Sequence, residues 1–591
     1  MHGLGTKSRG NVTLSLVLTR YYYSRRGEFM NKKWWKESVI YQIYPISFKD
    51  TTGDGKGDLR GIIEKLDYLQ ELGVDAIWIC PIYASPDYDN GYDISDYYGI
   101  DRKYGTMEDF DELLQKAHAR NIRIIMDLVL NHSSHEHEWF IESSASKDNP
   151  KRDYYIWREP KENGGYPNNW ESYFSGSVWE FDERTQEYYM HLYAKEQPDL
   201  NWENPEVVRE LHDMVKWWLE KGVDGFRFDA ISHIVKAEGL PDADNPQNLP
   251  VVQAYHFFSN LDKVHYFLRT LNEDVLDFYD IMNVGEVSGL GPEQALDYVG
   301  EGRNELDMIF QFEHMFLDAK SGGTGKWDIK PWTLIDLKKI MSRWQTVLHK
   351  KGWNANYMSN HDQPRQVSRF GNDGDYRVRS AKMLATFLHT LQGTPYIYQG
   401  EEIGMTNVQF PSIDQYRDVE TLNYYNQCIK RGMDEKEVMQ RIWKKSRDNA
   451  RTPMQWNFEE HAGFTDGQPW MDVNPNYPKI NVEAARRDPD SIFHHYRKLI
   501  ELRKKHEVIV YGDYRLLLPV HEEIYAFVRN WEDEKLLVIL NFFSGAPTFE
   551  WPEDLQGMKE ELLISNYEPI DGEELYSLNL RPYEARVYKL S

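Results

Sequence analysis

Short apolar runs alternate with amphipathic segments over most of this 591-residue chain. The runs predict buried strands, because each is only a few residues long and largely apolar. They are SVIYQIYP (38–45), DAIWICPI (75–82), RIIMDLVLNH (123–132), GFRFDAI (225–231), YDIMNVGEV (279–287), NANYMSN (354–360) and TPYIYQG (394–400). Segments between them, such as 59–73 and 107–121, have helical spacing. This alternation indicates a parallel α/β sheet, and eight such units would close into a (β/α)8 TIM barrel.

Two regions interrupt the alternation. Residues 133–204 are polar and rich in Gly, Pro, Trp and Tyr, which predicts a small inserted domain after the third strand. The runs IYAFVRNW, KLLVILNFF and EARVYKL predict an antiparallel β-sandwich domain at 512–591. The catalytic barrel is then expected at 30–132 and 205–511. Residues 1–29 contain the weakly signal-like NVTLSLVLT without a small-residue cleavage site, and we expect a non-native or disordered extension there.

Composition excludes several kinds of partner. The formal net charge of −26 argues against nucleic acid and against an anionic membrane surface, because both require a positive face. Only two cysteines occur, Cys80 and Cys428, so a disulfide framework is excluded and a reducing, cytoplasmic compartment is predicted. No apolar stretch reaches the ~18–20 residues of a membrane span. We expect a monomer or a weak homodimer.

Three of the strand-like runs end in or lead into a carboxylate: Asp229, Glu286 and Asp362. The active site of a (β/α)8 barrel lies at the C-terminal ends of its strands. A retaining glycosidase needs a nucleophilic and a protonated carboxyl group held about 5 Å apart. A single Asp at a strand end is more often a cap or an ion-pair partner, but three together indicate glycoside hydrolysis.

Five motifs carry a family resemblance. DLVLNH (Asp127–His132), QPDLN (Gln197–Asn201), GFRFDA (Gly225–Ala230), VGEV (Val284–Val287) and SNHDQPR (Ser359–Arg365) occur in this order. The chain thereby resembles glycoside hydrolase family 13, the α-amylase superfamily, and within it the oligo-1,6-glucosidase and α-glucosidase branch. The resemblance extends from Met30 to Ser591. It implies a retaining exo-acting α-glucosidase that needs no cofactor for its chemistry and takes a small oligosaccharide as its partner.

The resemblance implies roles for the residues that match. Asp229 would be the nucleophile, Glu286 the general acid/base, and Asp362 the third carboxylate that binds hydroxyls and favours the cationic transition state. Arg227 shares a strand face with Asp229 and can keep it ionised. Asp127 would support the site. His132 and His361 match histidines that hydrogen-bond the first sugar; a structural ion pair and core histidines are the alternatives.

A further group of residues implies a closed pocket. In this branch, residues matching Asp89 and Arg447 clamp the non-reducing-end glucose, and a residue matching Tyr92 stacks on its ring. Phe174 is also assigned to substrate binding. A pocket closed behind one glucose implies exo action on maltose and short malto-oligosaccharides. Core packing of Tyr92 and an ordinary salt bridge between loops are the alternatives.

The segment DTTGDGKGD has oxygen ligands at alternate positions, namely Asp50, Thr52, Asp54, the Lys56 carbonyl and Asp58. This spacing resembles the first part of an EF-hand loop, although Gly61 stands at the twelfth position in place of Glu. The branch often holds Ca2+ or Mg2+ in a matching loop. We therefore expect a structural cation outside the chemistry, with a metal-free Asx turn as the alternative.

Ala230 bears on the bond that is cut. In this branch Val after the nucleophile accompanies α-1,6 preference, and Ala or Thr accompanies α-1,4 or mixed preference, because a β-branched side chain narrows the second subsite. The sequence thus favours maltose, with some isomaltose or sucrose activity and transglycosylation as a side reaction. An oligo-1,6-glucosidase is the main alternative.

Three other functions are less favoured. A sucrose isomerase would carry an arginine-rich loop where this chain has FLDAKSGG (316–323). A trehalose-6-phosphate hydrolase would need a phosphate-binding cluster, which the sequence does not reveal. A catalytically dead sugar-binding barrel would have lost catalytic carboxylates, and all three are present here.

Overall fold

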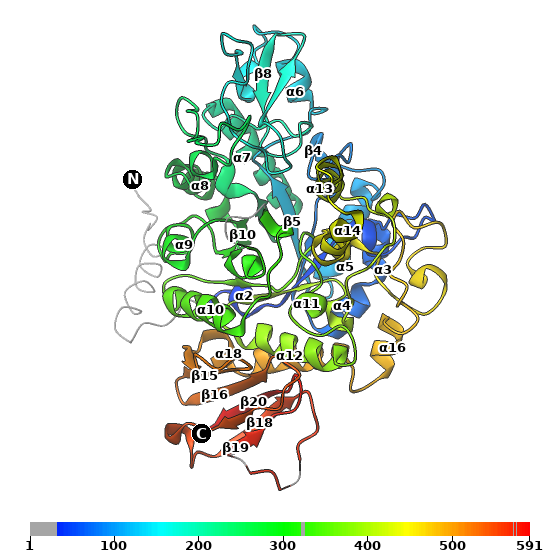
Figure 1. Cartoon of the computed structure of the whole chain (residues 1–591), viewed down its shortest axis with the longest axis vertical. Coiled ribbons are helices and arrows are strands. Elements are labelled where there is room, and N and C mark those ends of the chain that lie inside the picture. The colour runs from blue at the N-terminus through cyan, green and yellow to red at the C-terminus, as the bar shows by residue number, and fades with distance from the viewer. Residues whose placement is uncertain (1–31, 321–324, 571, 575) are drawn as a thin grey trace, which may run out of the picture.

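The computed structural model describes residues 32–320, 325–570, 572–574 and 576–591 (Figure 1). Its centre is a barrel of eight parallel strands that pair in chain order. They are β1 (Ile40–Ile43), β2 (Ala76–Ile79), β5 (Arg123–Val129), β9 (Gly225–Asp229), β10 (Met282–Glu286), β11 (Met308–Phe310), β12 (Ala355–Asn356) and β13 (Thr394–Tyr398). β13 pairs back onto β1, and a parallel bridge between Ile309 and Asn354 closes the remaining gap. The predicted TIM barrel is confirmed, whereas the predicted extension at 1–29 lies outside the described residues.

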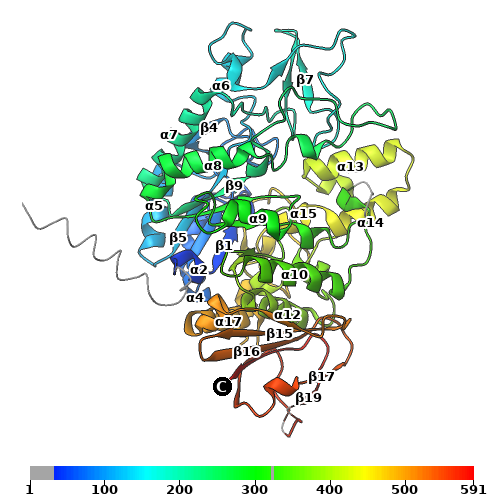
Figure 2. The same cartoon turned by 90° about the vertical axis from the view of Figure 1, so that its left-hand side faces the viewer.

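Helices surround the barrel, as Figures 1 and 2 show. They are α3 (Leu59–Glu64), α4 (Leu66–Leu72), α5 (Met107–His118), α7 (Pro205–Lys221), α8 (Lys263–Asp274), α9 (Pro292–Val299), α10 (Leu334–Leu348), α12 (Arg377–Thr390) and α17 (Ile492–Lys505). Local sequence sets their ends: α7 begins after the capping side chain of Asn204 and stops at Gly222, whose φ of 109° suits glycine. The segment 59–73, expected as one helix, divides at Lys65 into α3 and α4.

A small lobe follows β5 and lies at the top of Figure 1. It contains α6 (Glu138–Ser143) and a three-stranded antiparallel sheet of β6 (Trp157–Arg158), β8 (Glu187–Met190) and β7 (Trp179–Asp182). Its core is shared with the long excursion after β9, because Leu240 and Phe258 pack in one cluster with Trp170 and Met190. The lobe therefore draws on residues beyond the predicted 133–204.

Two further units flank the barrel. A helical hairpin of α13 (Val419–Lys430) and α14 (Glu435–Lys445) follows β13, and the sequence analysis does not predict it. The C-terminal domain has a five-stranded antiparallel sheet of β14 (Arg515–Leu517), β15 (Ile524–Trp531), β16 (Glu534–Asn541), β20 (Ala585–Leu590) and β18 (Glu560–Ser565). A pair, β17 (Thr548–Glu550) and β19 (Ser577–Asn579), completes it. In the described part of the chain, no helix is long and apolar enough to cross a membrane.

Candidate active site

The predicted catalytic carboxylates meet at the C-terminal end of the barrel. Asp229 ends β9, Glu286 ends β10, and Asp362 lies in the loop after β12. All three line one cavity of about 220 Å³. Its lining residues are Asp89, Tyr92, His132, Tyr173, Phe174, Tyr193, Asp229, Glu286, Lys326, Asp362, Gln363, Glu420 and Arg447.

One buried guanidinium organises the floor of this cavity. Arg227 places Nη1 2.6 Å from Asp229 Oδ1 and 2.9 Å from Asp127 Oδ1, while Nη2 lies 2.5 Å from Glu286 Oε2. Arg227 is 1% exposed and lies beneath the cavity rather than in its lining. Asp127 also accepts hydrogen bonds from Trp78 Nε1 and the Tyr92 hydroxyl, both at 3.1 Å. It thus supports Arg227 from behind and does not face the cavity.

Asp229 and Glu286, the two cavity carboxyl groups that contact Arg227, differ in pKa. Burial raises the pKa of Asp229 to about 6, against the opposing charge of Arg227. Burial raises the pKa of Glu286 further, to about 7, with Arg227 opposing and the charges of Asp229 and Asp362 adding to the rise. Near neutral pH the arrangement favours ionised Asp229 and leaves a substantial fraction of Glu286 protonated, which is the division of labour that glycosidase chemistry requires.

Asp362 is held ionised. Burial alone would raise its pKa, but the contact with His361 and the charges of Arg447 and Arg451 keep it well below its ordinary value. Arg451 Nη2 lies 2.7 Å and Arg447 Nη1 3.2 Å from Asp362 Oδ1. A stable negative charge at this position can stabilise the positive charge that develops on a sugar ring.

A hydrogen-bond chain fixes His361. The Gln42 amide lies 2.8 Å from His361 Nδ1, while Nε2 lies 2.7 Å from the Tyr92 hydroxyl and 3.1 Å from Asp362 Oδ2. If the amide nitrogen donates to Nδ1, the proton sits on Nε2 and is donated toward Tyr92 and Asp362. The rings of Tyr92 and His361 stack 5.3 Å apart, and His361 is fully buried. His361 therefore lies behind Tyr92, which itself lines the cavity.

An ion-pair cluster forms part of the cavity lining. Arg447 Nη2 lies 3.2 Å from Asp89 Oδ1 and 2.6 Å from Asp418 Oδ1. Its guanidinium carbon lies 5.2 Å from the centre of the Phe174 ring. The predicted partners Asp89, Arg447 and Phe174 are thus in contact and line the cavity together.

The remaining predicted residues also belong to this site. His132 lines the cavity, with Nε2 3.0 Å from the Tyr92 carbonyl oxygen and 3.1 Å from the Gln197 amide nitrogen. Ala230 is buried beside the cavity, and its backbone N–H donates to Glu286 Oε2 at 3.3 Å. Its φ of 45° lies in the left-handed region, where a β-branched residue is strained.

Sequence reasoning missed four cavity-lining residues that lie next to the clamp, since Glu420 is 3.6 Å from Arg447 and the Tyr193 ring is 5.7 Å from that of Phe174. Lys326 and Glu420 line the cavity and form an ion pair of 2.5 Å between the segment after β11 and α13. Tyr173 and Tyr193, from the small lobe, stack 5.1 Å apart. Neither pair lies in a motif or at a strand end, so no local pattern distinguishes them. Arg451 lies in the same SRDNARTPMQW segment as Arg447 and could have been considered with it.

The predicted metal loop is closed by its own hydrogen bonds. Asp50 Oδ1 accepts the backbone N–H of Thr52 and Gly53, and Oδ2 accepts that of Gly55, at 2.8–2.9 Å. Asp58 accepts the backbone N–H of Thr51 at 2.7 Å. Among the described residues, no three His, Cys, Asp or Glu side chains are grouped to hold a metal. As the side chains lie, the oxygens of Asp50 and Asp58 accept backbone N–H groups, so the metal stays a prediction.

Comparison with known proteins decides the family. The model of the α-amylase catalytic domain matches residues 42–512. The chain belongs to the α-amylase family. The C-terminal domain of maltogenic amylase, another component found in α-amylase family proteins, matches residues 514–587. The prediction of a glycoside hydrolase in this family is confirmed.

Relatives within the α-amylase family cover nearly the whole chain. An oligo-1,6-glucosidase of Parageobacillus thermoglucosidasius is 59% identical over 562 residues, which is 95% of this chain and all of that protein. The crystal structure of Bacillus licheniformis trehalose-6-phosphate hydrolase has a TM-score of 0.90 at 51% identity, covering 95% of this chain and all of that one. The isomaltulose synthase of Protaminobacter rubrum has a TM-score of 0.91 at 43% identity, with the same coverage. The α-glucosidase prediction is thereby supported at a general level.

Proposed function

We propose that this enzyme is a retaining exo-α-glucosidase acting on short oligosaccharides, with maltose preferred. Asp229 attacks the anomeric carbon while Glu286 gives its proton to the departing glycosidic oxygen, so the C–O bond breaks and a glycosyl ester forms. Glu286, now ionised, takes a proton from water, which attacks the same carbon and releases Asp229. Two displacements restore the α configuration of the released glucose.

The observation that carries this proposal is the shared guanidinium. Arg227 contacts both Asp229 and Glu286, at 2.6 and 2.5 Å, so the two carboxyl groups are held close together. An inverting enzyme separates its carboxyl groups to leave room for water between them. The close arrangement supports retention. Proton NMR of a digest of 4-nitrophenyl α-glucoside, which releases a single glucose, should show α-glucose first, and initial release of β-glucose would refute the proposal.

Exo action is supported by the contacts within the cavity lining. The Asp89–Arg447 pair and Phe174 are in contact there, and we infer that they block a longer chain. A cavity of about 220 Å³ is below the ~300–1,000 Å³ typical of sites for larger ligands. We expect digestion of maltotetraose to yield glucose and maltotriose at first. Early accumulation of maltose without glucose would indicate endo or maltose-releasing action.

The linkage is tested by measuring glucose release from maltose, isomaltose, sucrose and trehalose 6-phosphate in parallel. We expect maltose to have the highest kcat/KM, because Ala230 leaves the second subsite wide. Fastest release from isomaltose would favour the second candidate, an oligo-1,6-glucosidase, which is the name of the 59%-identical relative. Trehalose 6-phosphate should be a poor substrate, since the cavity cations Lys326 and Arg447 both form ion pairs with carboxylates.

An Asp229→Ala variant tests whether the protein is an enzyme. An enzyme should lose turnover in this variant, whereas a binding protein should keep its affinity for sugars.

We also propose that the loop from Asp50 to Asp58 takes up Ca2+ as a structural ion. Oxygen-bearing residues at alternate positions support this, and their present hydrogen bonds to backbone N–H groups would have to be exchanged in part. Millimolar Ca2+ should raise Tm, and EDTA should lower it, by a few degrees. An unchanged Tm would mean that hydrogen bonds alone hold the loop.

A further inference from the structure

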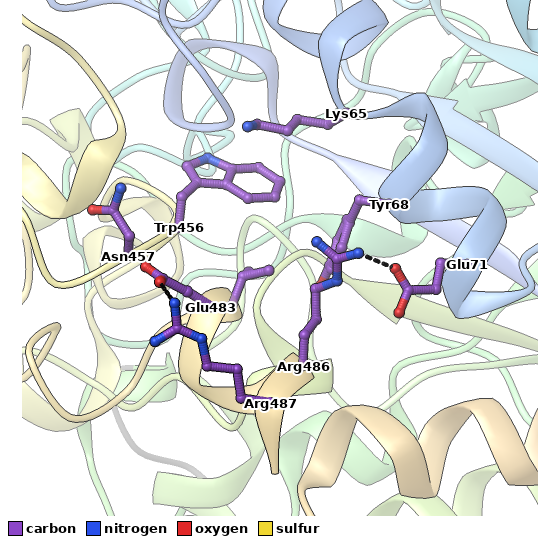
Figure 3. Close-up of a pocket in the computed structure, with 9 residues that line it drawn as sticks. Lys65, Tyr68, Glu71, Trp456, Asn457, Glu483, Arg486 and Arg487 are labelled. Carbon is purple, nitrogen blue, oxygen red and sulfur yellow. Dashed lines mark hydrogen bonds and ion pairs between the residues drawn. The ribbon is translucent and has the colours of Figure 1, made fainter. Parts of the chain in front are cut away.

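A second hollow, of about 510 Å³, opens on the side of the barrel between α4 and the short helix α16 (Val482–Arg487). Figure 3 shows its side chains. Its apolar floor is made by three buried residues, Tyr68, Trp456 and Val482. Its polar rim consists of Lys65, Glu71, Asn457, Glu483, Arg486 and Arg487. The rim residues take no part in the active-site contacts described above.

The ammonium group of Lys65 forms no ion pair with any described residue. Its Nζ lies 4.6 Å from the centre of the Trp456 ring. Burial lowers the pKa of Lys65, and the charges of Lys49 and Arg486 lower it further, while the charge of Glu64 opposes them. A partly buried cation facing other cations is costly, and a cation–π contact offsets this cost only in part.

The two arginines leave donors unused. Arg486 pairs with Glu71 through Nη2, and Arg487 pairs with Glu483 through Nη2, as the dashed lines of Figure 3 mark. The other guanidinium N–H groups have no hydrogen-bond acceptor among the described residues. Three cations therefore face two carboxylates, an excess of one positive charge in a chain whose net charge is −26. This local charge is positive, whereas the net charge of the whole chain is negative.

We propose that this hollow binds a phosphate monoester of a sugar. A phosphate group accepts hydrogen bonds from ammonium and guanidinium groups, supplies a countercharge for Lys65 and takes up unused N–H donors of Arg486. The sugar ring can pack on the apolar floor at Trp456 and Val482, while Asn457 and Glu483 offer partners for its hydroxyls. A neutral sugar would leave Lys65 unpaired, and a polyanion such as nucleic acid would be repelled by the net charge.

Isothermal titration of the full-length enzyme tests the proposal, with glucose 6-phosphate, inorganic phosphate and glucose as separate ligands at one ionic strength. We expect saturable binding of glucose 6-phosphate, at least fivefold weaker binding of inorganic phosphate, and the same glucose 6-phosphate affinity when glucose is present. Equal affinity for the two phosphates would overturn the sugar part of the proposal.

Two variants locate the binding. Lys65→Gln and Arg486→Gln should each weaken glucose 6-phosphate binding at least tenfold and leave maltose turnover unchanged. Arg343→Gln is the matched control, because Arg343 is a similarly exposed arginine paired with Glu293. The Arg343→Gln variant should bind glucose 6-phosphate with the same affinity as the unmodified enzyme. Equal affinity in all three variants, or no saturable binding by the unmodified enzyme, would overturn the proposal.

Discussion

Arg227 contacts the carboxyl groups of both Asp229 and Glu286 and opposes the rise in their pKa that burial causes. In the proposed mechanism Asp229 acts ionised, so lowering the pH below about 6 should add a proton to it and remove activity. Glu286 acts protonated in that mechanism, so raising the pH above about 7 should remove its proton and also reduce activity. We expect kcat/KM for maltose to follow a bell with its maximum between these values, measured from pH 4 to 9 at constant ionic strength.

A profile that stays flat from pH 5 to 9 would contradict this division of roles. Glu286→Gln offers a control, because it removes the group responsible for the alkaline limb. Its kcat should fall by about 10²–10⁴, the usual contribution of a general acid or base.

Ala230 combines a position beside the cavity with an unusual backbone. Val at this position would narrow the second subsite and strain a φ of 45°. We expect Ala230→Val to lower kcat/KM for maltose at least fivefold more than for isomaltose, and to lower Tm. Ala230→Gly is the control, since glycine adopts positive φ freely and should leave the maltose to isomaltose ratio unchanged or raised. An unchanged ratio in the Val variant would remove Ala230 from linkage choice.

At the scale of elements, the sequence predicts long apolar runs well and short ones poorly. Seven predicted runs contain barrel strands, but β11 has only three residues, Met308–Phe310, and gives too short a pattern. The hairpin of α13 and α14 was missed because its helices lie outside the βα alternation. Its packing partners, such as Trp327, come from a distant segment. Contacts between remote segments leave no local pattern in either one.

The loop that carries Asp89 and Tyr92 is held by a buried side chain, Asp93. Its carboxylate accepts the backbone N–H groups of Tyr88 and Asp89 and the Ser85 hydroxyl, each at 3.0 Å. Asp93→Asn would replace one carboxylate oxygen, a hydrogen-bond acceptor, with an amide NH2 group. That donor would face the N–H and O–H donors that Asp93 now accepts. We expect KM for maltose to rise about five- to tenfold, equivalent to one hydrogen bond, with kcat changed less, because the clamp binds substrate and transition state alike.

Asp96→Asn is the control for this prediction. Asp96 is exposed and also accepts a backbone N–H, that of Tyr98 at 2.9 Å. Its KM should stay within twofold of the unmodified enzyme. A fall in kcat without a change in KM for Asp93→Asn would show that Asp93 acts on the chemistry rather than on the clamp.

At the scale of the whole molecule, the candidate site depends on closure of the barrel. The carboxylates could be predicted because each lies at or shortly after a strand, and the clamp of Asp89 and Arg447 could be predicted because both residues match the family pattern. The Lys326–Glu420 pair and the stacked Tyr173 and Tyr193 come from the segment after β11, α13 and the small lobe. Their meeting depends on how these units dock around the barrel, which no single segment encodes.

Docking of the C-terminal domain rests partly on one buried lysine. Lys338 of α10 is fully buried and donates to the carbonyl oxygens of Leu518 and His521, both at 2.7 Å. Lys338→Met keeps the aliphatic stem, leaves the His521 carbonyl without a donor, and leaves the Leu518 carbonyl with only the His521 N–H at 3.2 Å. We expect a loss of about 2–3 kcal/mol in the free energy of unfolding by urea. Lys339→Met, on the exposed face of the same helix, should cost less than about 0.5 kcal/mol; equal losses would contradict the docking role.

The ion pair of Asp89 and Arg447 lies in the lining of the cavity. In the proposed function this pair blocks one end, so a released glucose leaves through the same opening by which the next sugar enters. We therefore expect water to attack the glycosyl ester in dilute solution, with chains shortened by one glucose per turnover. In a concentrated sugar solution we expect sugar hydroxyl groups to compete with water for the ester, so that the same residues join sugars. The ratio of synthesis to hydrolysis would then depend on the sugar concentration around the enzyme as well as on its catalytic groups.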